Sequence, residues 1–286
     1  MSITFKNVAH TYNPDSPFSY AALKDINLTI PDGKVTAIIG ETGSGKSTLV
    51  QHLNALLLPT EGELQINEKI ISSSSKPKNL KALRKQVGLV FQFPEYQLFE
   101  ETIEKDISFG PKNFGVSEED AIARTREIID IVGLDESYLQ RSPFDLSGGQ
   151  KRRVAIAGIL AMDPDVLVLD EPTAGLDPQG AMDMMQLFVR MNRDYKKTVL
   201  IVTHDMEHVL NYCDEVIVVR DGSIEKQCDV TSFFEQIDLL KELNINPPAV
   251  IRLREELIAR GFAIDKTILD LEELAKAVAK EVSVHE

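Results

Sequence analysis

The chain has 286 residues, which is enough for one α/β core with an appendage, and its ordinary apolar content predicts a packed interior. Its formal net charge of −14 argues against non-specific capture of the nucleic-acid backbone, so no nucleic-acid partner is expected. The two cysteines lack metal-ligand spacing, and the longest apolar run, residues 154–162, is far shorter than the roughly 20 residues of a membrane span, so we expect neither a zinc knuckle nor a transmembrane helix.

The N-terminal part of the chain predicts a small antiparallel β layer. Residues 3–8 and 28–30 lie on either side of a turn-rich segment, and residues 63–66 follow a Pro-Thr-Glu-Gly turn. Further runs rich in β-branched residues predict buried strands at residues 35–39, 87–91, 166–169, 199–202 and 216–219. Helical stretches separate these runs, so we expect a mostly parallel sheet with helices on its faces.

Two regions have a mainly helical pattern. Between about residues 94 and 163, Ser117 and Ser147 each begin a segment with helix-start signals, which indicates a helical subdomain inserted into the core. After Gly222 the strand signals fade, and amphipathic stretches predict a small C-terminal helical appendage. The expected domains are therefore residues 1–225, which contain the helical subdomain, and residues 226–286.

The most specific motif follows the strand predicted at residues 35–39 and opens a helix. It matches G-x-x-x-x-G-K-[ST], in which glycines let backbone N–H groups curl around the β- and γ-phosphates of a nucleotide. The lysine supplies a point charge, and the serine hydroxyl ligates Mg²⁺. A glycine-rich turn that only joins a strand to a helix is the structural alternative. The candidate ATP ligands are Gly40, Glu41, Thr42, Gly43, Ser44, Gly45, Lys46, Ser47 and Thr48, with Ser47 also a candidate metal ligand.

Two adjacent carboxylates, Asp170 and Glu171, end the apolar run at residues 166–169. The C-terminal edge of a parallel sheet is where such folds place their ligands. Because neighbouring side chains on a strand point to opposite sides, we expect Asp170 to face Mg²⁺ and Glu171 to face an attacking water. A pair that merely caps a strand is the alternative.

The segment Ser147-Gly148-Gly149-Gln150, called the signature here, stands before the helical run at residues 151–162. Ser147 and Gln150 have the spacing of a capping box, so a capped helix is the simplest explanation. Two consecutive glycines just inside a helix lower its stability, however, and this cost makes sense if bare N–H groups must approach an anion closely.

Leu-Ser-Gly-Gly-Gln about a hundred residues after a phosphate loop, and sixteen residues before a strand that ends in Asp-Glu, resembles the ABC ATPases. The resemblance covers residues 1 to about 225 and implies a P-loop NTPase core. In that family the signature of one subunit closes on the γ-phosphate held by the phosphate loop of the other. The resemblance therefore implies that Ser147 and Gly149 act in trans, with Gly148 and Gln150 beside them.

The same resemblance gives roles to four further positions. Gln92 resembles the glutamine that contacts Mg²⁺ and the attacking water, although a buried amide is its plain alternative. Asp177, in Gly-Leu-Asp-Pro, resembles the D-loop that crosses the dimer interface, and His204 resembles the switch histidine of the γ-phosphate. Tyr12 stands where the family stacks an aromatic ring on adenine, but packing is its alternative. The implied cofactors are ATP and Mg²⁺, with catalytic residues Glu171, His204, Gln92 and Lys46 and metal ligands Ser47, Gln92 and Asp170.

A function of a different class is suggested by His204 and His208, which frame an H-x-x-E-H pattern found in one group of zinc proteases. A zinc metallopeptidase would need both histidines on one helix face and a third ligand. His204 instead ends a predicted strand, which counts against this alternative.

The residues after Gln92, Phe-Pro-Glu-Tyr-Gln-Leu-Phe, and those after the signature, Lys-Arg-Arg-Val-Ala-Ile-Ala-Gly, resemble the ATPases of energy-coupling factor (ECF) importers of vitamins and metal ions. Of the usual two paralogues, the chain resembles the second, because it has Asn-Pro-Asp-Ser-Pro-Phe at residues 13–18 and Phe-Gly-Pro-Lys-Asn-Phe-Gly at residues 109–115. The resemblance implies a heterodimer with a paralogous ABC ATPase, held together partly by residues 226–286. The pair would lie on the cytoplasmic face of the cell membrane, beneath a transmembrane coupling subunit and beside a substrate-binding membrane subunit. An ATPase of another ABC importer type, for metal ions or other solutes, is the alternative within the family.

Residues 93–104 mix apolar and acidic side chains. We hypothesise that they form an apolar groove rimmed by acids that receives basic coupling helices of the membrane subunit. A solvated helix face over ordinary core residues is the alternative. The side chains concerned are Tyr96, Leu98, Phe99, Glu95, Glu100, Glu101 and Glu104.

Overall fold

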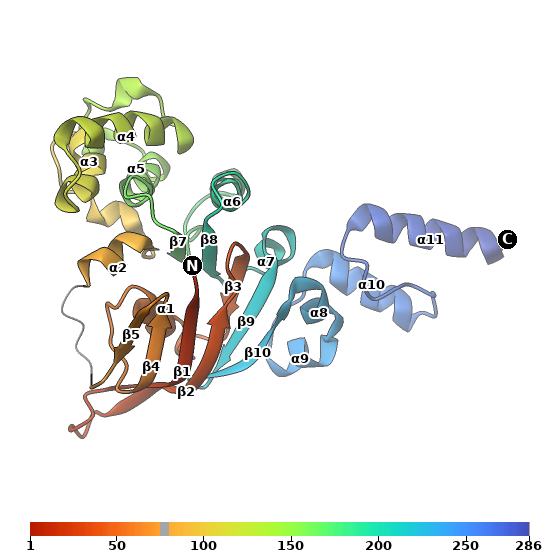
Figure 1. The fold of residues 1–286 in the computed structure, drawn as a ribbon. Coiled ribbons are helices and arrows are strands. Elements are labelled where there is room, and N and C mark those ends of the chain that lie inside the picture. The colour runs from red at the N-terminus through yellow and green to blue at the C-terminus, as the bar shows by residue number, and fades with distance from the viewer. Residues whose placement is uncertain (75–79, 286) are drawn as a thin grey trace.

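The computed structural model describes residues 1–74 and 80–285 and places two β-sheets side by side, with a helical subdomain on one flank and a C-terminal appendage on the other (Figure 1). Within those two ranges no helix combines the length and the apolar character needed to cross a bilayer.

The larger sheet has six strands in the order β10-β9-β3-β8-β7-β6. All the neighbouring pairs from β9 to β6 are parallel, and β10 is antiparallel to β9. Every residue of the central strands β3 and β8 is buried, as expected for a parallel sheet covered on both faces. The strands are β3 (Val35–Ile39), β6 (Val87–Val90), β7 (Val166–Asp170), β8 (Thr198–Val202), β9 (Glu215–Arg220) and β10 (Ser223–Asp229).

The smaller sheet is antiparallel, in the order β2-β1-β4-β5, and confirms the predicted N-terminal β layer. Its apolar face packs on α1 (Lys46–Leu53), whose opposite side contacts the larger sheet, so one core fills the space between the two sheets. The strands are β1 (Ile3–Tyr12), β2 (Tyr20–Ile30), β4 (Glu61–Ile66) and β5 (Lys69–Ser72).

The other face of the larger sheet is covered by α6 (Pro178–Arg193) and α7 (Met206–Tyr212). Alternate residues of β8 separate the two cores: Leu200 packs toward α1, whereas Ile201 packs toward Phe188 of α6. The helix that follows the phosphate loop, α1, and the helix α7 therefore pack on opposite faces of the same sheet.

The predicted helical subdomain is present and packs around α5, which lies against α3 and α4 (Figure 1). Ser117 caps α4 and Ser147 caps α5, as their sequence signals predicted. The helices of this region are α2 (Lys81–Gln86), η1 (Pro94–Gln97), α3 (Ile103–Asn113), α4 (Glu118–Ile131), η2 (Glu136–Tyr138), η3 (Pro143–Asp145) and α5 (Gly148–Leu160).

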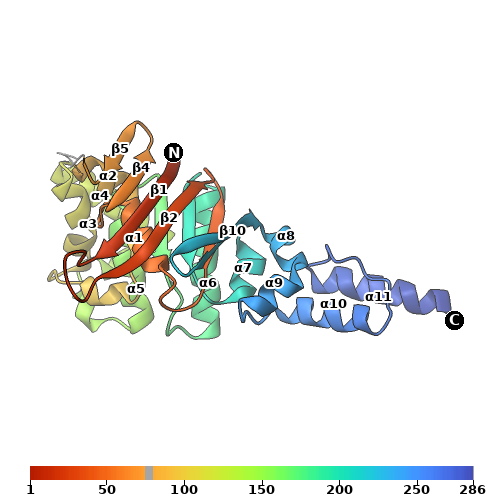
Figure 2. The same ribbon diagram turned by 90° about the horizontal axis from the view of Figure 1, so that it is seen from below.

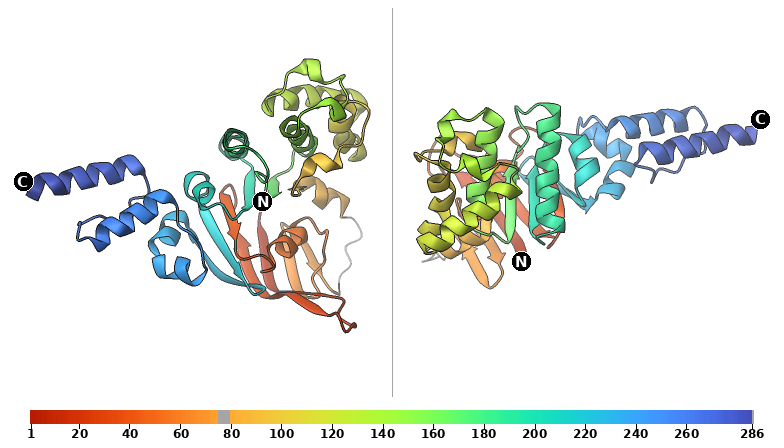
Figure 3. Two further views of the ribbon diagram at one scale, coloured as in Figure 1. Left: turned by 180° about the vertical axis from the view of Figure 1, so that it is seen from behind. Right: turned by 90° about the horizontal axis from the view of Figure 1, so that it is seen from above.

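The appendage projects from the edge of the larger sheet and carries the C-terminus at its far end (Figures 2 and 3). Arg254, fully buried, holds its helices together by donating to the carbonyl oxygens of Phe234 at 2.9 Å and Ile268 at 3.2 Å. The helices are α8 (Val230–Glu235), α9 (Ile237–Glu242), α10 (Ala249–Ala259) and α11 (Leu271–His285).

One expectation about this region is wrong, because the strands themselves do not end at Gly222. β10 runs from Ser223 to Asp229, so the boundary expected between residues 225 and 226 falls inside a strand of the larger sheet. β10 is an edge strand that alternates half-buried and exposed residues and has no apolar run. That pattern explains why apolar runs did not reveal it.

Candidate functional site

The phosphate loop joins β3 to α1 and leaves no room for side chains at two of its glycines. Gly40 has φ +148°, and a Cβ there would lie 2.1 Å from the carbonyl oxygen of Val219. Gly45, with φ +106°, caps α1, and a Cβ there would lie 2.6 Å from the carbonyl oxygen of Ala22. Both positions therefore require glycine, and the backbone they permit exposes the N-terminus of α1 to an anion.

Lys46 lies over this loop, where its Nζ donates to the carbonyl oxygens of Gly40 at 2.8 Å and Glu41 at 2.7 Å. Burial lowers the pKa of Lys46, and the nearby charges of Glu171 and Asp170 oppose that shift. The structure thus brings the loop lysine to the two predicted carboxylates. The buried hydroxyl of Ser44 has no hydrogen-bond partner among the described residues, which suits a loop that receives phosphate oxygens.

Asp170 and Ser47, two of the predicted metal ligands, lie together. Burial raises the pKa of Asp170, while a hydrogen bond from Ser47 and the charge of Lys46 act in the opposite direction. A carboxylate and a hydroxyl beside a phosphate loop are the oxygen donors that Mg²⁺ takes when substrate phosphates complete its shell. The donor set therefore fits magnesium.

Glu171, the predicted base, contacts His204, the predicted switch histidine. Its Oε1 lies 2.9 Å from Nδ1 of His204. The reason given for its orientation is wrong, however, because β7 ends at Asp170 and strand alternation does not reach Glu171. Glu171 has φ +49°, and its backbone N–H donates to the carbonyl oxygen of Val202 at 3.0 Å. A left-handed turn bonded to β8 directs this carboxylate.

Gln92 follows β6 and is exposed, so it is not the buried amide of the alternative interpretation. Asp177 is also exposed, and its Oδ1 accepts a hydrogen bond from the backbone N–H of Gly180 at 2.8 Å. That bond caps α6 and fixes the segment that precedes the helix.

The signature forms the predicted capping box. The N–H of Gln150 donates to Ser147 Oγ at 3.3 Å, and the N–H of Ser147 donates to Gln150 Oε1 at 3.0 Å. A Cβ at Gly148 or Gly149 would meet no atom of the described residues within 4 Å, the adjoining backbone of its own helix apart. Gln150 of the signature lines a cleft against α6, whereas Gly40 and Glu41 of the phosphate loop line two other cavities. The chain therefore leaves the glycines of its signature facing open space.

A buried arginine that the sequence analysis missed connects the signature helix to two other loops. Arg152 forms two hydrogen bonds with Glu95, at 3.0 and 2.8 Å, and donates to the carbonyl oxygens of Pro172 at 3.2 Å and Ala174 at 2.7 Å. Burial would raise the pKa of Glu95, but the hydrogen bonds and charge of Arg152 outweigh it and hold that pKa below its usual value.

This pair corrects the predicted acidic groove, since Glu95 is engaged inside the chain. Leu98 is buried as well. Tyr96 and Phe99 are exposed, and the Phe99 ring packs edge-to-face against Phe109 at 4.9 Å between centroids. What the region offers is a set of four exposed aromatic side chains, called the aromatic patch here: Phe93, Tyr96, Phe99 and Phe109.

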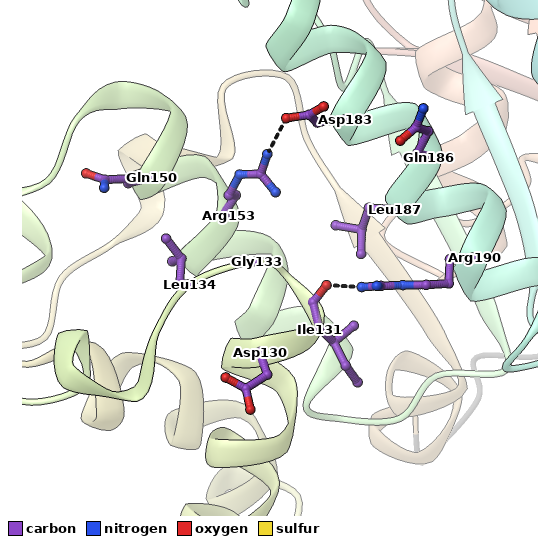
Figure 4. A pocket seen from close by; sticks show the side chains of 10 residues that line it. All are labelled: Asp130, Ile131, Gly133, Leu134, Gln150, Arg153, Asp183, Gln186, Leu187 and Arg190. Atoms are coloured by element: carbon purple, nitrogen blue, oxygen red, sulfur yellow. Dashed lines mark hydrogen bonds and ion pairs between the residues drawn. The ribbon is translucent and has the colours of Figure 1, made fainter.

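A cleft of about 530 Å³ separates the helical subdomain from α6 (Figure 4). Gln150 and Arg153 come from α5 on one wall, and Asp183 and Arg190 come from α6 on the other. Arg153 pairs with Asp183 at 3.4 Å, and Arg190 donates to the carbonyl oxygen of Ile131. Two arginine contacts thus join the signature helix region to the helix that begins at the predicted D-loop.

Tyr12 lies beside α1, where its hydroxyl is 3.2 Å from Oγ1 of Thr48 and its ring packs edge-to-face on His10 at 4.6 Å. Tyr20 faces it across the β1–β2 pair and donates its hydroxyl proton to the carbonyl oxygen of Gly43 at 3.2 Å. Two tyrosines, not one, are therefore anchored to the phosphate loop and its helix.

The structure contradicts the geometry needed for zinc proteolysis. His204 precedes α7 and is exposed, whereas His208 lies inside that helix, so the two do not share a helix face. In the part of the chain that the structure describes, no group of three or more His, Cys, Asp or Glu side chains could hold a metal ion.

Comparison with known proteins agrees with this site. The model of the family described as ABC transporter matches residues 23–174. An energy-coupling factor transporter ATP-binding protein EcfA2 of Enterococcus faecalis is 54% identical over 282 residues, 99% of this chain and 98% of the relative. Its namesake in Geobacillus kaustophilus is 51% identical over 290 residues, the full length of both chains.

Solved structures give the same result. The cbiO1 protein of Clostridium perfringens, part of the ABC transporter complex cbiONQ, superposes with a TM-score of 0.74 at 38% identity, over 88% of this chain and 98% of its own. The ATP-binding cassette MJ0796, dimeric and bound to ADP and Pi, superposes with a TM-score of 0.70 at 33% identity, over 80% and 98%. The chain therefore belongs to the ABC transporter ATPases, and within them to the ATP-binding subunits of energy-coupling factor transporters.

Proposed function

We propose that this ATPase subunit hydrolyses ATP between its own phosphate loop and the signature of a second, paralogous ABC ATPase, and so drives import of a vitamin or another micronutrient. The observation that carries the proposal is the contact between Glu171 and His204 beside Lys46 and the phosphate loop. Relatives that are 51–54% identical over 99–100% of this chain are named energy-coupling factor transporter ATP-binding proteins, which favours this importer type over another ABC importer type.

Binding and charge stabilisation come from the loop. The N–H groups at the start of α1 and the ammonium group of Lys46 neutralise the β- and γ-phosphates, and the ring of Tyr12 stacks on adenine. Ser47, Asp170 and Gln92 would hold Mg²⁺, which would supply positive charge beside the phosphates. To reach the phosphates, Lys46 exchanges its bonds to Gly40 and Glu41 for bonds to phosphate oxygens.

Chemistry at the γ-phosphate falls to two side chains. Glu171 orients the attacking water and accepts its proton, and His204 donates a hydrogen bond to the γ-phosphate. The hydrogen bond between Glu171 and His204 holds both groups in place before nucleotide arrives. Asp177, at the start of α6, lies at the subunit interface.

A second subunit is supported by the open face of the signature. Small residues at Gly148 and Gly149 are not needed to fit this chain, because among the described residues no other element approaches a Cβ at either position. A neighbouring ATP bound to a partner ATPase gives them a function, with Ser147 and the helix N-terminus contacting its γ-phosphate. The dimeric state of the MJ0796 cassette agrees with this arrangement.

Two observations support membrane partners: the exposed aromatic patch, and the fact that cbiO1 is part of an ABC transporter complex. A transmembrane coupling subunit would contact the patch formed by Phe93, Tyr96, Phe99 and Phe109, and a substrate-binding membrane subunit would lie in the same complex. The ATPase pair would then lie on the cytoplasmic face of the membrane, held partly by the appendage.

The decisive test is Glu171→Gln, which keeps the shape of the side chain but removes its basicity. ATP binding should remain within about twofold of the wild type, and turnover of the assembled complex should fall at least about a hundredfold. Both are measured by nucleotide-binding titration and phosphate release. Glu127→Gln, on the exposed face of α4, is the matched control. Near-normal turnover of Glu171→Gln would remove Glu171 from the role of base.

A further inference from the structure

The appendage packs directly against the two segments that present the nucleotide site. Ile39, which immediately precedes Gly40, and Met206, two residues after His204, share one hydrophobic cluster with Leu240 and Ile251 of the appendage. The chain thus places α9 and α10 behind both the phosphate loop and the segment that carries His204.

Two small cavities lie along this contact. One, of about 220 Å³, is lined by Gly40 and Glu41 on one side and by Leu243 and Asn244 on the other. A second, of about 240 Å³, is lined by the same four residues and by His204. The connection between α9 and α10 therefore faces the nucleotide site from within the same subunit.

A polar contact fixes the start of α10 to the start of α7. Oε1 of Glu207 accepts a hydrogen bond from the backbone N–H of Ala249 at 2.8 Å. Pro248 stands at the N-cap of α10 and offers no capping side chain, so Glu207 supplies the cap from another element. A carboxylate at this end also interacts favourably with the helix dipole.

The path from Glu207 back to His204 is short and hydrogen-bonded. Asp205 Oδ1 accepts from the N–H groups of Glu207 at 2.9 Å and His208 at 3.2 Å, and the Asp205 N–H donates to Thr203 Oγ1 at 3.0 Å. His204 itself is 83% exposed and has Glu171 as its side-chain contact. Its position therefore depends on the backbone that Thr203, Asp205 and Glu207 hold.

We propose that Glu207 is a positioning residue for ATP hydrolysis, which ties His204 to the appendage through the first N–H of α10. The inference rests on the proposed role of His204 at the γ-phosphate. It also gives a function to the glutamate of the H-x-x-E-H pattern, which is not part of a zinc site. The appendage then acts on the chemistry of its own subunit in addition to joining two ATPases.

The experiment measures ATP turnover of the intact complex purified from membranes, with variants of the full-length chain. Glu207→Ala removes the acceptor, and Ala249→Pro removes the donor at the first position of a helix, where proline is well tolerated. Each should lower kcat about tenfold while KM for ATP stays within about twofold, because a displaced His204 impairs the chemical step and not binding. Glu207→Gln, whose amide oxygen accepts the same bond, should restore most of the activity.

The matched control is Asp270→Ala, which removes the cap of α11 in the same appendage, where Asp270 accepts from Glu272 and Glu273 at 2.8 and 3.0 Å. Its kcat should stay at the wild-type value. In a His204→Ala background, Glu207→Ala should cause no further loss, because both changes act through one group. Equal losses in Glu207→Ala and Asp270→Ala, or an additive loss in that background, would overturn the inference. Wild-type turnover of His204→Ala would instead contradict the proposed function itself.

Discussion

At the scale of single residues, Glu171 shows how backbone conformation sets chemistry. A non-glycine residue with φ +49° is costly unless its surroundings hold it, and here the carbonyl of Val202 and the ring of His204 do so. The sequence predicted a catalytic role for both Glu171 and His204, though not the contact between them. It could not predict the left-handed turn, because that turn depends on a hydrogen bond to a strand thirty-one residues further along the chain.

His52 provides a residue-scale prediction about pH. It is fully buried in α1, its Nδ1 donates to the carbonyl oxygen of Thr48 at 2.7 Å, and its Nε2 has no partner among the described residues. Burial lowers the pKa of His52 from 6.5 to about 4. Since the folded pKa lies below the unfolded one, the neutral ring stabilises the fold fully above pH 6.5, and this stability is lost as pH falls toward 4.

We expect His52 to reduce the free energy of unfolding by about 1 kcal/mol for each pH unit in that window. His52→Leu cannot titrate and should show a shallower pH dependence. Urea denaturation at pH 7, 6 and 5 measures both slopes. Identical slopes in the variant and the wild type would show that His52 does not titrate as its burial implies.

At the scale of elements, Arg152 connects α5, the segment after Gln92 and the segment after Glu171. Arg152→Met would leave Glu95 largely buried without its partner, which should cost about 3–5 kcal/mol of unfolding free energy at pH 7. Chemical denaturation measures the loss. Arg126→Met, on the exposed face of α4, is the control. Adding Glu95→Gln to Arg152→Met should recover part of the lost free energy of unfolding, because it removes the unpaired charge. If the double variant recovered none of it, the result would count against a buried ion pair.

This pair also predicts a pH effect with a defined sign. In the folded chain the pKa of Glu95 lies below its ordinary value of 4.5. The pair of Arg152 and Glu95 therefore makes its full contribution to the free energy of unfolding above pH 4.5, and this contribution is lost as pH falls through the lower folded pKa.

The sequence was sufficient for elements with a strong local signal and insufficient for those defined by distant partners. Apolar runs located the central strands, and Ser117 and Ser147 located two helix starts, because each signal lies within a few residues. The edge strand β10 was missed since its residues alternate without an apolar run. The bond between Arg152 and Glu95 was missed because it joins residues 57 positions apart.

At the scale of the whole molecule, Gln150 of the signature and Gly40 of the phosphate loop line different cavities of one chain. We expect Ser147→Arg to leave ATP binding by the isolated chain within about twofold of wild type and to lower turnover of the assembled pair at least about tenfold. Isothermal titration and phosphate release measure the two effects, with Glu127→Arg as the control. Loss of ATP binding by the isolated Ser147→Arg chain would contradict action in trans.

A second prediction at this scale concerns the membrane partner. Glu100 and Glu101 border the aromatic patch, and reversing both to lysine should weaken assembly with a coupling subunit that presents basic helices. The yield of co-purified membrane subunits measures assembly. Reversal of Glu119 and Glu127, exposed on α4, is the control. An intact complex after reversal of Glu100 and Glu101 would place the docking surface elsewhere.

The turn between β9 and β10 meets the phosphate loop backbone to backbone. The N–H of Gly222 donates to the carbonyl oxygen of Ser44 at 3.0 Å, and the carbonyl oxygen of Gly222 accepts from the N–H of Lys24 at 2.7 Å. A Cβ at Gly222 would lie 2.8 Å from the carbonyl oxygen of Ala22. A reporter peptide inserted into this hairpin would push on the nucleotide cradle and on the N-terminal sheet together, even though the hairpin is a surface turn of the kind usually chosen for insertions.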